Sequence, residues 1–172
     1  MEMFVEESMF PTIEQAATRS GLSLRSLYRY FADQGELVEA AIKRNQEQGA
    51  ELARLSSIGE GPLDGRIEDF VTMRLRVYEA MGPVFRATTA NAARHARIRD
   101  ERARNRNLLR EQFEAQFAPE LGALRPADRD AVLSTGDVLT QLDSIDYLRR
   151  HRQLSVPEVH RALATALAAL LG

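Results

Sequence analysis

The side chains best suited to chemistry gather in the stretch GLSLRSLYRYF, residues 21–31, which holds two arginines and two tyrosines. Read as a helix, it places Leu27 and Phe31 on one side, four residues apart, and turns Arg25 and Arg29 elsewhere. Arginine binds phosphates and guanine edges, and neighbouring hydroxyl groups fix the register of a helix on DNA. The pattern is typical of a helix that enters a DNA major groove. It is equally typical of a surface helix with solvated arginines.

Composition excludes several other kinds of site. The 172 residues include no cysteine, so disulfides, cysteine-based metal sites and thiol nucleophiles are excluded. No apolar run approaches the roughly 20 residues that span a bilayer, and no signal peptide is evident, so we expect a cytoplasmic protein without membrane contact. The net charge of −2 confines any nucleic-acid contact to a local surface.

Helix-forming residues dominate and β-branched runs are missing, so we expect an all-α chain. A capping box at Thr12 opens the first expected helix, and Gly21 is placed to end it in a left-handed turn. Ser23 and Asp33 cap the next two helices, the second of which should reach about Leu55. Two short helices backed by a longer one form a helix-turn-helix with its supporting strut.

The segment 56–65, SSIGEGPLDG, is the clearest break in the chain. We therefore expect a head over 1–55, a linker over 56–65 and a helical body over 66–172. The first body helix, 66–81, is apolar on more than one face and should be buried, and Gly82-Pro83 should break it. A short helix is expected over about 84–93, followed by a long charged helix that ends before Pro119. Two more are expected, one from Pro126 to about Arg150 and one from Ser155 to Gly172.

Over residues 12–42, TIEQAATRSGLSLRSLYRYFADQGELVEAAI, the chain resembles the TetR family of bacterial transcriptional repressors. The C-terminal stretch LDSIDYLRRHRQLSVPEVHRALATALAALL is similar to the corresponding part of many members, whereas the middle resembles them only in length and helicity. The head positions that carry the resemblance are Thr12, Ala17, Gly21, Ser23, Leu27, Tyr28, Tyr30, Phe31 and Leu37.

The resemblance implies a homodimer whose two heads each read half of a double-stranded DNA operator, and whose bodies bind a small, apolar effector without any cofactor. It implies no enzymatic activity. Position by position, Thr12 and Ser23 would bond phosphates through their helix caps, and Arg25 and Ser26 would face base edges. Tyr28, Arg29 and Tyr30 would complete the DNA-binding set, with the tyrosines against the backbone.

The head departs from the family pattern in three places. Leu24 stands where relatives usually have a polar or basic residue, and Gln34 replaces a frequent lysine that anchors phosphate. The front, MEMFVEESMF, is acidic and short, with only Met3, Phe4, Met9 and Phe10 to cover the head. We therefore expect the helix that precedes Thr12 in the family to be shortened here, and DNA binding to be weakened.

Pliable methionine and large aromatic side chains in the body suit an irregular apolar ligand site, although plain core is the alternative for each of them. The polar groups best placed to orient a ligand are Tyr78, Thr88, Asn91, Gln112 and Gln116. The residues expected to line the site are Met73, Val77, Met81, Phe85, Leu109, Phe113 and Phe117.

Surplus apolar residues on the last two expected helices suit a two-fold four-helix interface between subunits. The residues expected at this interface are Val138, Leu142, Ile145, Leu163, Leu167 and Leu170.

Three other groups of side chains favour structural roles. The segment 94–110 holds seven arginines, but interleaved acidic residues favour a solvated, ion-paired helix over a second nucleic-acid surface. The three histidines, His95, His151 and His160, have no second ligand at metal spacing, so we expect no metal site. Asp143 and Asp146 lie three residues apart but lack a catalytic partner.

These patterns together favour a ligand-responsive dimeric repressor. Two alternatives stay open. One is a helical small-molecule-binding and dimerisation protein with a degenerate head, and the other is a small helical enzyme.

Overall fold

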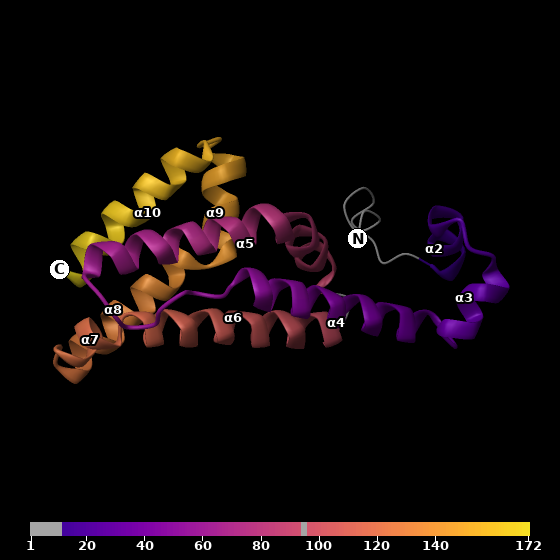
Figure 1. Cartoon of the computed structure of the whole chain (residues 1–172), viewed down its shortest axis with the longest axis horizontal. Coiled ribbons are helices and arrows are strands. Elements are labelled where there is room, and N and C mark those ends of the chain that lie inside the picture. Colours follow the sequence, from indigo (N-terminus) through magenta and orange to yellow (C-terminus); the bar gives the residue numbers. More distant parts are fainter. Residues whose placement is uncertain (1–11, 94–95) are drawn as a thin grey trace.

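The computed structural model describes residues 12–93 and 96–172, and every regular element within them is a helix. The predicted all-α class is therefore confirmed. The molecule is elongated: α2 and α3 lie at one end, α4 runs back from them, and the other helices pack together at the opposite end (Figure 1). The elements are α2 (Ile13–Ser20), α3 (Leu24–Tyr30), α4 (Gln34–Leu52), α5 (Leu63–Asn91), α6 (Ala96–Gln116), α7 (Ala118–Gly122), α8 (Pro126–Thr140), α9 (Leu142–Asp146), η1 (Tyr147–His151) and α10 (Val156–Leu171).

The three head helices begin where their capping residues predict. The Thr12 side chain accepts the backbone N–H of Gln15 at 3.2 Å, and the Gln15 side chain accepts the N–H of Thr12 at 2.8 Å, which completes the capping box. Gly21 follows α2 with a φ of 69°, a left-handed conformation that glycine adopts at little cost. Ser23 and Asp33 each accept the backbone N–H three residues on.

Helix α5 corrects the expected break at Gly82-Pro83, because it runs unbroken past both residues to Asn91. A proline inside a helix costs about 3 kcal/mol through its missing N–H and its clash with the preceding turn. Buried side chains on both sides of the proline, Met81 and Ala87 among them, offset that cost. Tertiary packing here overrides a local signal that would end an isolated helix.

The helix expected from Pro126 to about Arg150 is in fact interrupted. Helix α8 ends at Thr140, Gln141 is extended with ψ of 150°, and α9 and the π-helical segment η1 follow. The Gln141 side chain donates to Asp137 Oδ1 at 2.5 Å and to the carbonyl of Arg106 at 3.3 Å, which holds the interruption against α6. The change of direction lets Ile145 enter the core with no exposed surface.

Two other expected boundaries in the body are confirmed. Helix α6 ends at Gln116, before Pro119, although the short α7 follows it directly. Helix α10 begins directly after Ser155, as expected, and Glu158 accepts the backbone N–H of Ser155 at 2.7 Å.

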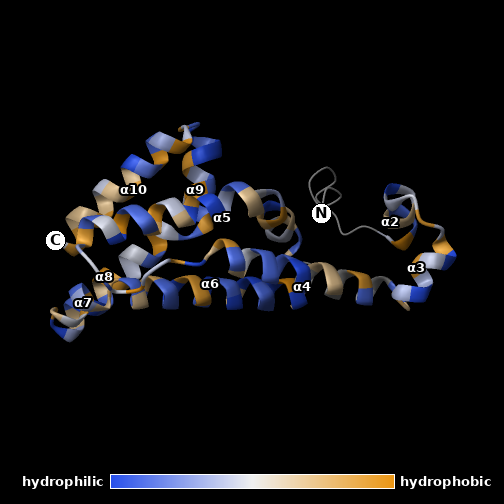
Figure 2. Cartoon of the chain, in the orientation of Figure 1, coloured by the Kyte–Doolittle hydropathy of each residue, from blue (hydrophilic) through white to orange (hydrophobic). Residues whose placement is uncertain are grey.

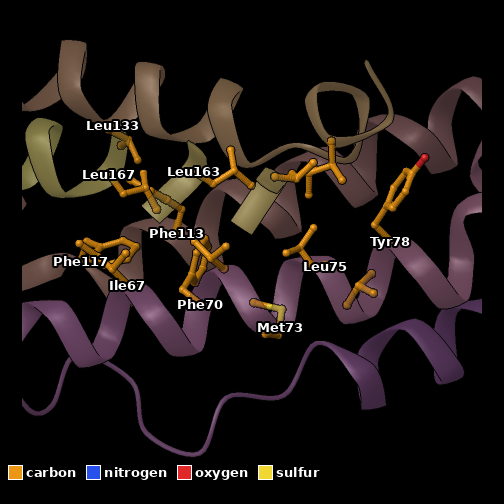
Figure 3. Packing of buried hydrophobic residues seen from close by; sticks show 14 of the residues in the cluster. Ile67, Phe70, Met73, Leu75, Tyr78, Phe113, Phe117, Leu133, Leu163 and Leu167 are labelled. Atoms are coloured by element: carbon orange, nitrogen blue, oxygen red, sulfur yellow. The ribbon is translucent and has the colours of Figure 1, made fainter. Parts of the chain in front are cut away.

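The main core lies where α5, α6, α8 and α10 meet (Figure 3). Phe70 of α5 packs edge-on against Phe113 of α6 and against Phe117, which follows α6, with ring centroids 5.7 Å and 5.3 Å away. Gly136 of α8 makes room for one of these rings, because a Cβ atom there would lie only 2.0 Å from Phe113 Cζ. Helices α8 and α10 add Leu133, Leu163 and Leu167 from the other side.

The described side chains of the head form a smaller core of their own. The buried residues among them are Ile13, Ala17 and Leu27, with Phe31 and Leu37 among the partly buried residues against them. Apolar residues concentrate in the body, while α6 is largely hydrophilic along its outer side (Figure 2). Within residues 12–93 and 96–172, no helix is both long enough and apolar enough to cross a membrane.

Replacing Gly136 with alanine tests the fit between α8 and α6. We expect Gly136→Ala to lower the free energy of unfolding by about 1–3 kcal/mol, because the added methyl group overlaps the Phe113 ring. Gly49→Ala is the matched control, since a Cβ atom there meets nothing within 4 Å and α4 should gain about 0.5–1 kcal/mol. Chemical denaturation of both variants measures the difference, and equal stability of the two would contradict this packing.

Candidate functional site

Helix α3 turns one side chain inward and presents the rest to solvent. Leu27 is 6% exposed, whereas Tyr28 and Tyr30 are 51% and 63% exposed. Between Gln15 and Ala32 the chain carries three arginines and no acidic residue. The outer surface of α3 is therefore both aromatic and basic.

The two arginines of α3 differ in their surroundings. Arg29 donates to the Tyr30 hydroxyl at 3.3 Å, and its guanidinium lies 5.3 Å from the centroid of the Tyr30 ring. Arg25 is exposed and makes no hydrogen bond or ion pair within the described ranges. Arg25 is thus free to reach a partner outside the chain, while Arg29 and Tyr30 support one another.

The predicted hydroxyl contacts lie at the starts of the two head helices. Thr12 and Ser23 use a lone pair each to cap their helices. Ser26 Oγ lies 2.9 Å from Ser23 Oγ, so one of these two hydroxyls donates to the other. A hydrogen bond from the Thr12 side chain lowers the pKa of Glu14, so only one hydrogen of the serine pair stays available as a donor.

The three departures from the family pattern have different outcomes. Leu24 is 43% exposed on α3, so it does not serve as core. The side chain of Gln34 and the whole front, with Met3, Phe4, Met9 and Phe10, lie outside the described residues.

Most of the residues expected to line a ligand cavity are instead buried in the body, which corrects the assignment of those residues. Phe113 and Phe117 have no exposed surface, and their ring centroids lie 4.8 Å apart. Phe85 and Leu109 are partly buried. The others, Met73, Val77, Tyr78, Met81 and Asn91, are at most 8% exposed.

The polar groups expected to orient a ligand are bonded to the protein itself. Tyr78 donates to Asp146 Oδ1 at 2.8 Å, and burial, together with this bond, raises the pKa of Tyr78 to about 12. Gln116 accepts the backbone N–H of Gly59 at 3.3 Å, and Thr88 donates to the carbonyl of Phe85 at 2.9 Å. Asn91 donates to the carbonyl of Ala87 at 2.8 Å.

The C-terminal end of α4 is fastened to the body by two side chains. Arg76 of α5 donates to the carbonyl of Leu52 at 3.0 Å and 2.8 Å and to that of Arg54 at 3.1 Å. Gln112 of α6 donates to the carbonyl of Ala53 at 2.5 Å. These carbonyls lie at the end of α4 or just beyond it, where no helical N–H is left to bond them, so the body supplies their hydrogen bonds.

A buried arginine holds the Gln112 amide in place. Arg74 has no exposed surface, and it donates to Gln112 Oε1 and to the carbonyl of Leu109, both at 2.7 Å. Its guanidinium lies 4.4 Å from the centroid of the Phe70 ring. Burial lowers the pKa of Arg74 to about 9, and the nearby charge of Asp137 opposes this shift only in part. The chain Arg74–Gln112–Ala53 links the core to α4, and sequence patterns gave no sign of it.

A second buried arginine fixes the segment between α4 and α5. Arg66 is 5% exposed, forms a salt bridge with Glu120, and donates to the carbonyls of Gly61 and Gln116 at 3.1 Å and 2.9 Å. The hydrogen bond from Arg66 lowers the pKa of Glu120. The predicted linker is thus held against α6 and α7.

An open cleft of about 640 Å³ lies between the head and the start of α6. Its lining residues come from the end of α3, from α4 and from α6. They are Tyr30, Phe31, Glu36, Ala40, Lys43, Gln46, Arg97, Glu101 and Arg104.

The residues expected at a subunit interface divide into two groups. Ile145, Leu163 and Leu167 are at most 2% exposed inside a single chain, which corrects their assignment to an interface between chains. Val138 is 63% exposed on α8, and Leu142 and Leu170 are partly buried.

The arginines of α6 form ion pairs, as expected, although most partners lie on other helices. Arg102 and Arg106 contact Asp143 at 3.2 Å and 3.0 Å, and Arg110 lies 3.6 Å from Asp137. Asp143 therefore ties α6 to α9 inside one chain.

The histidines have neighbours of other kinds. His160 lies 3.1 Å from a Glu68 carboxylate oxygen, and His151 stacks on Tyr147 with ring centroids 5.7 Å apart. His95 lies outside the described residues. No group of three potential metal ligands occurs in the described part of the chain.

Neither a model of a known protein family, nor a curated protein, nor a solved structure matches this chain.

The substitution Gln112→Glu tests the fastening of α4. A glutamate keeps an acceptor for Arg74 but loses the N–H that binds the carbonyl of Ala53, so α4 should loosen while the body stays folded. We expect amide hydrogen exchange near the end of α4 to speed up about fivefold, the equivalent of one hydrogen bond. Gln153→Glu is the control at an exposed loop position, and equal exchange in both variants would contradict the proposed role.

Proposed function

We propose that this chain is a helix-turn-helix DNA-binding protein that acts as a homodimeric, ligand-responsive transcriptional repressor. The observation that carries the proposal is the exposed surface of α3, with Arg25, Tyr28, Arg29 and Tyr30 outward and Leu27 alone buried. A short helix held by one buried leucine after a glycine turn has the shape of a recognition helix in the major groove.

The contacts available to this helix match the two kinds that DNA recognition needs. Arg25 has no partner in the described ranges and is suited to the acceptors of a guanine edge. Tyr28, Tyr30 and one hydroxyl of the Ser23–Ser26 pair offer donors to phosphate oxygens, which position the helix but carry no sequence information. The net charge of −2 means that affinity depends on these local contacts and should fall with salt.

The homodimer is supported by small residues on the outer sides of α8 and α10. Ala131, Ser134 and Val138 are exposed along α8, and Ala162 and Thr165 are exposed along α10. Small side chains allow helices of two subunits to approach closely, as in a four-helix interface. The interface therefore lies on this outer side, not on the buried leucines.

A second candidate function is a helical binding protein whose head does not bind DNA. The small head core and the exposed Leu24 favour it, because both weaken a recognition helix. Selection of DNA from a random pool, followed by a gel shift, separates the two: enrichment of one sequence supports the repressor, and no enrichment supports the binding protein.

Arg25→Ala tests base recognition by α3. We expect it to cost about 1–3 kcal/mol of binding free energy on the selected site and to relax preference at one base pair. Tyr28→Phe should weaken selected and random DNA alike, because it removes a phosphate contact. Arg125→Ala, a change far from the head, is the control. Equal losses on selected and random DNA in Arg25→Ala would remove Arg25 from base reading.

The double variant Val138→Glu/Thr165→Glu tests the subunit interface. It places four like charges across a two-fold contact, so sedimentation should show monomers while the helical circular dichroism is unchanged. Leu108→Glu, an equally exposed position on α6, should leave the dimer intact. Dimers of the double variant would place the interface on another surface.

A further inference from the structure

The geometry points to a ligand site in the cleft between head and body, where we propose that an elongated aryl-alkyl carboxylate binds. The volume of about 640 Å³ lies within the range typical of small-molecule sites. Its walls belong to α3, α4 and α6, so an occupant would contact the head and the body at the same time.

The shape of the cleft follows from the spacing on α4. Glu36, Ala40 and Lys43 recur at helical intervals along one side of α4 and all line the cleft. Glu36 and Lys43 are seven positions apart, which corresponds to a rise of about 10 Å along the helix axis. Ala40, with its small side chain, lies between them and leaves room for an extended molecule.

One end of the cleft is aromatic. Tyr30 and Phe31 line it at the end of α3, and Tyr30 is 63% exposed. Glu36, the acidic residue at this end, already accepts the backbone N–H of Ala32 at 2.7 Å. A ring of the ligand can therefore stack on Tyr30 without facing an unpartnered carboxylate.

The other end has a surplus of positive charge. Glu101 is 8% exposed and is bound by both Gln46 and Arg104, and it makes no ion pair with Lys43. Lys43 is exposed and has no hydrogen bond or ion pair among the described residues. A ligand carboxylate that lies near Lys43 would supply the missing counter-charge.

Occupation of the cleft has a consequence for DNA. Tyr30 lines the cleft and also belongs to the proposed DNA surface, so a bound ligand would hold it away from phosphate. This consequence rests on the proposed function, whereas ligand binding itself does not.

The test uses 1-pyrenebutyrate as the probe and neutral 1-pyrenebutanol as its uncharged analogue. The chain has no tryptophan, so pyrene fluorescence reports binding without interference. We expect saturable binding of 1-pyrenebutyrate that weakens about fivefold in Lys43→Gln, the value of one exposed ion pair. Arg44→Gln, which changes the neighbouring cation and its pair with Glu47, should bind as the wild type does.

A chemical readout is available because Lys43 is the chain's single lysine. 1-Pyrenebutyrate should slow acylation of Lys43 by an amine-reactive ester about fivefold, whereas 1-pyrenebutanol should not, with free Nα-acetyl-lysine as the internal reference. Binding that is equal in Lys43→Gln and Arg44→Gln, or no saturable binding, would overturn the site. Failure of the gel shift would overturn the proposed DNA function and leave Lys43 protection unchanged.

Discussion

The arrangement of the molecule depends on how the carbonyls at the end of α4 are bonded. A helix that joins a small head to a large body leaves its last carbonyls without partners, and unsatisfied buried carbonyls are costly. Arg76 and Gln112 supply the missing donors, and Arg74 holds Gln112 in the orientation that this requires. The direction of α4, and with it the position of the head, is set by side chains of α5 and α6.

Two buried arginines, Arg66 and Arg74, connect helices of the body to neighbouring segments of the chain. Arg66 fixes the segment before α5 by bonding to Glu120 and to backbone carbonyls. The Glu120 carboxylate compensates the buried charge of the Arg66 guanidinium. Arg74 bonds to backbone and amide acceptors, and its charge is offset by these hydrogen bonds, the Phe70 ring and the nearby charge of Asp137. Both residues make hydrogen bonds, which are directional, and these bonds help to fix the orientation of one helix on another.

The contrast between head and body has a consequence for any signal between them. The body has a close-packed core in which Gly136 and Phe113 interlock, whereas the buried core residues among the described side chains of the head are Ile13, Ala17 and Leu27. A ligand changes an equilibrium only through different affinities for two states. In the described chain, packing therefore constrains the junction of head and body, with its small head core and open cleft beside α4, less than it constrains the body core.

The sequence alone determined the features that depend on neighbouring residues. The capping box at Thr12, the start of α10 after Ser155, the left-handed turn at Gly21 and the outward arginines of α3 involve contacts within a few residues, and the structure has each of them. Only the tertiary structure decided the continuity of α5 through Pro83, the interruption at Gln141, and the burial of Ile145, Leu163 and Leu167 inside one chain. Those outcomes depend on which helix faces which. Periodicity shows that a helix has an apolar face, but it does not show whether that face packs against the same chain, a second chain or a ligand.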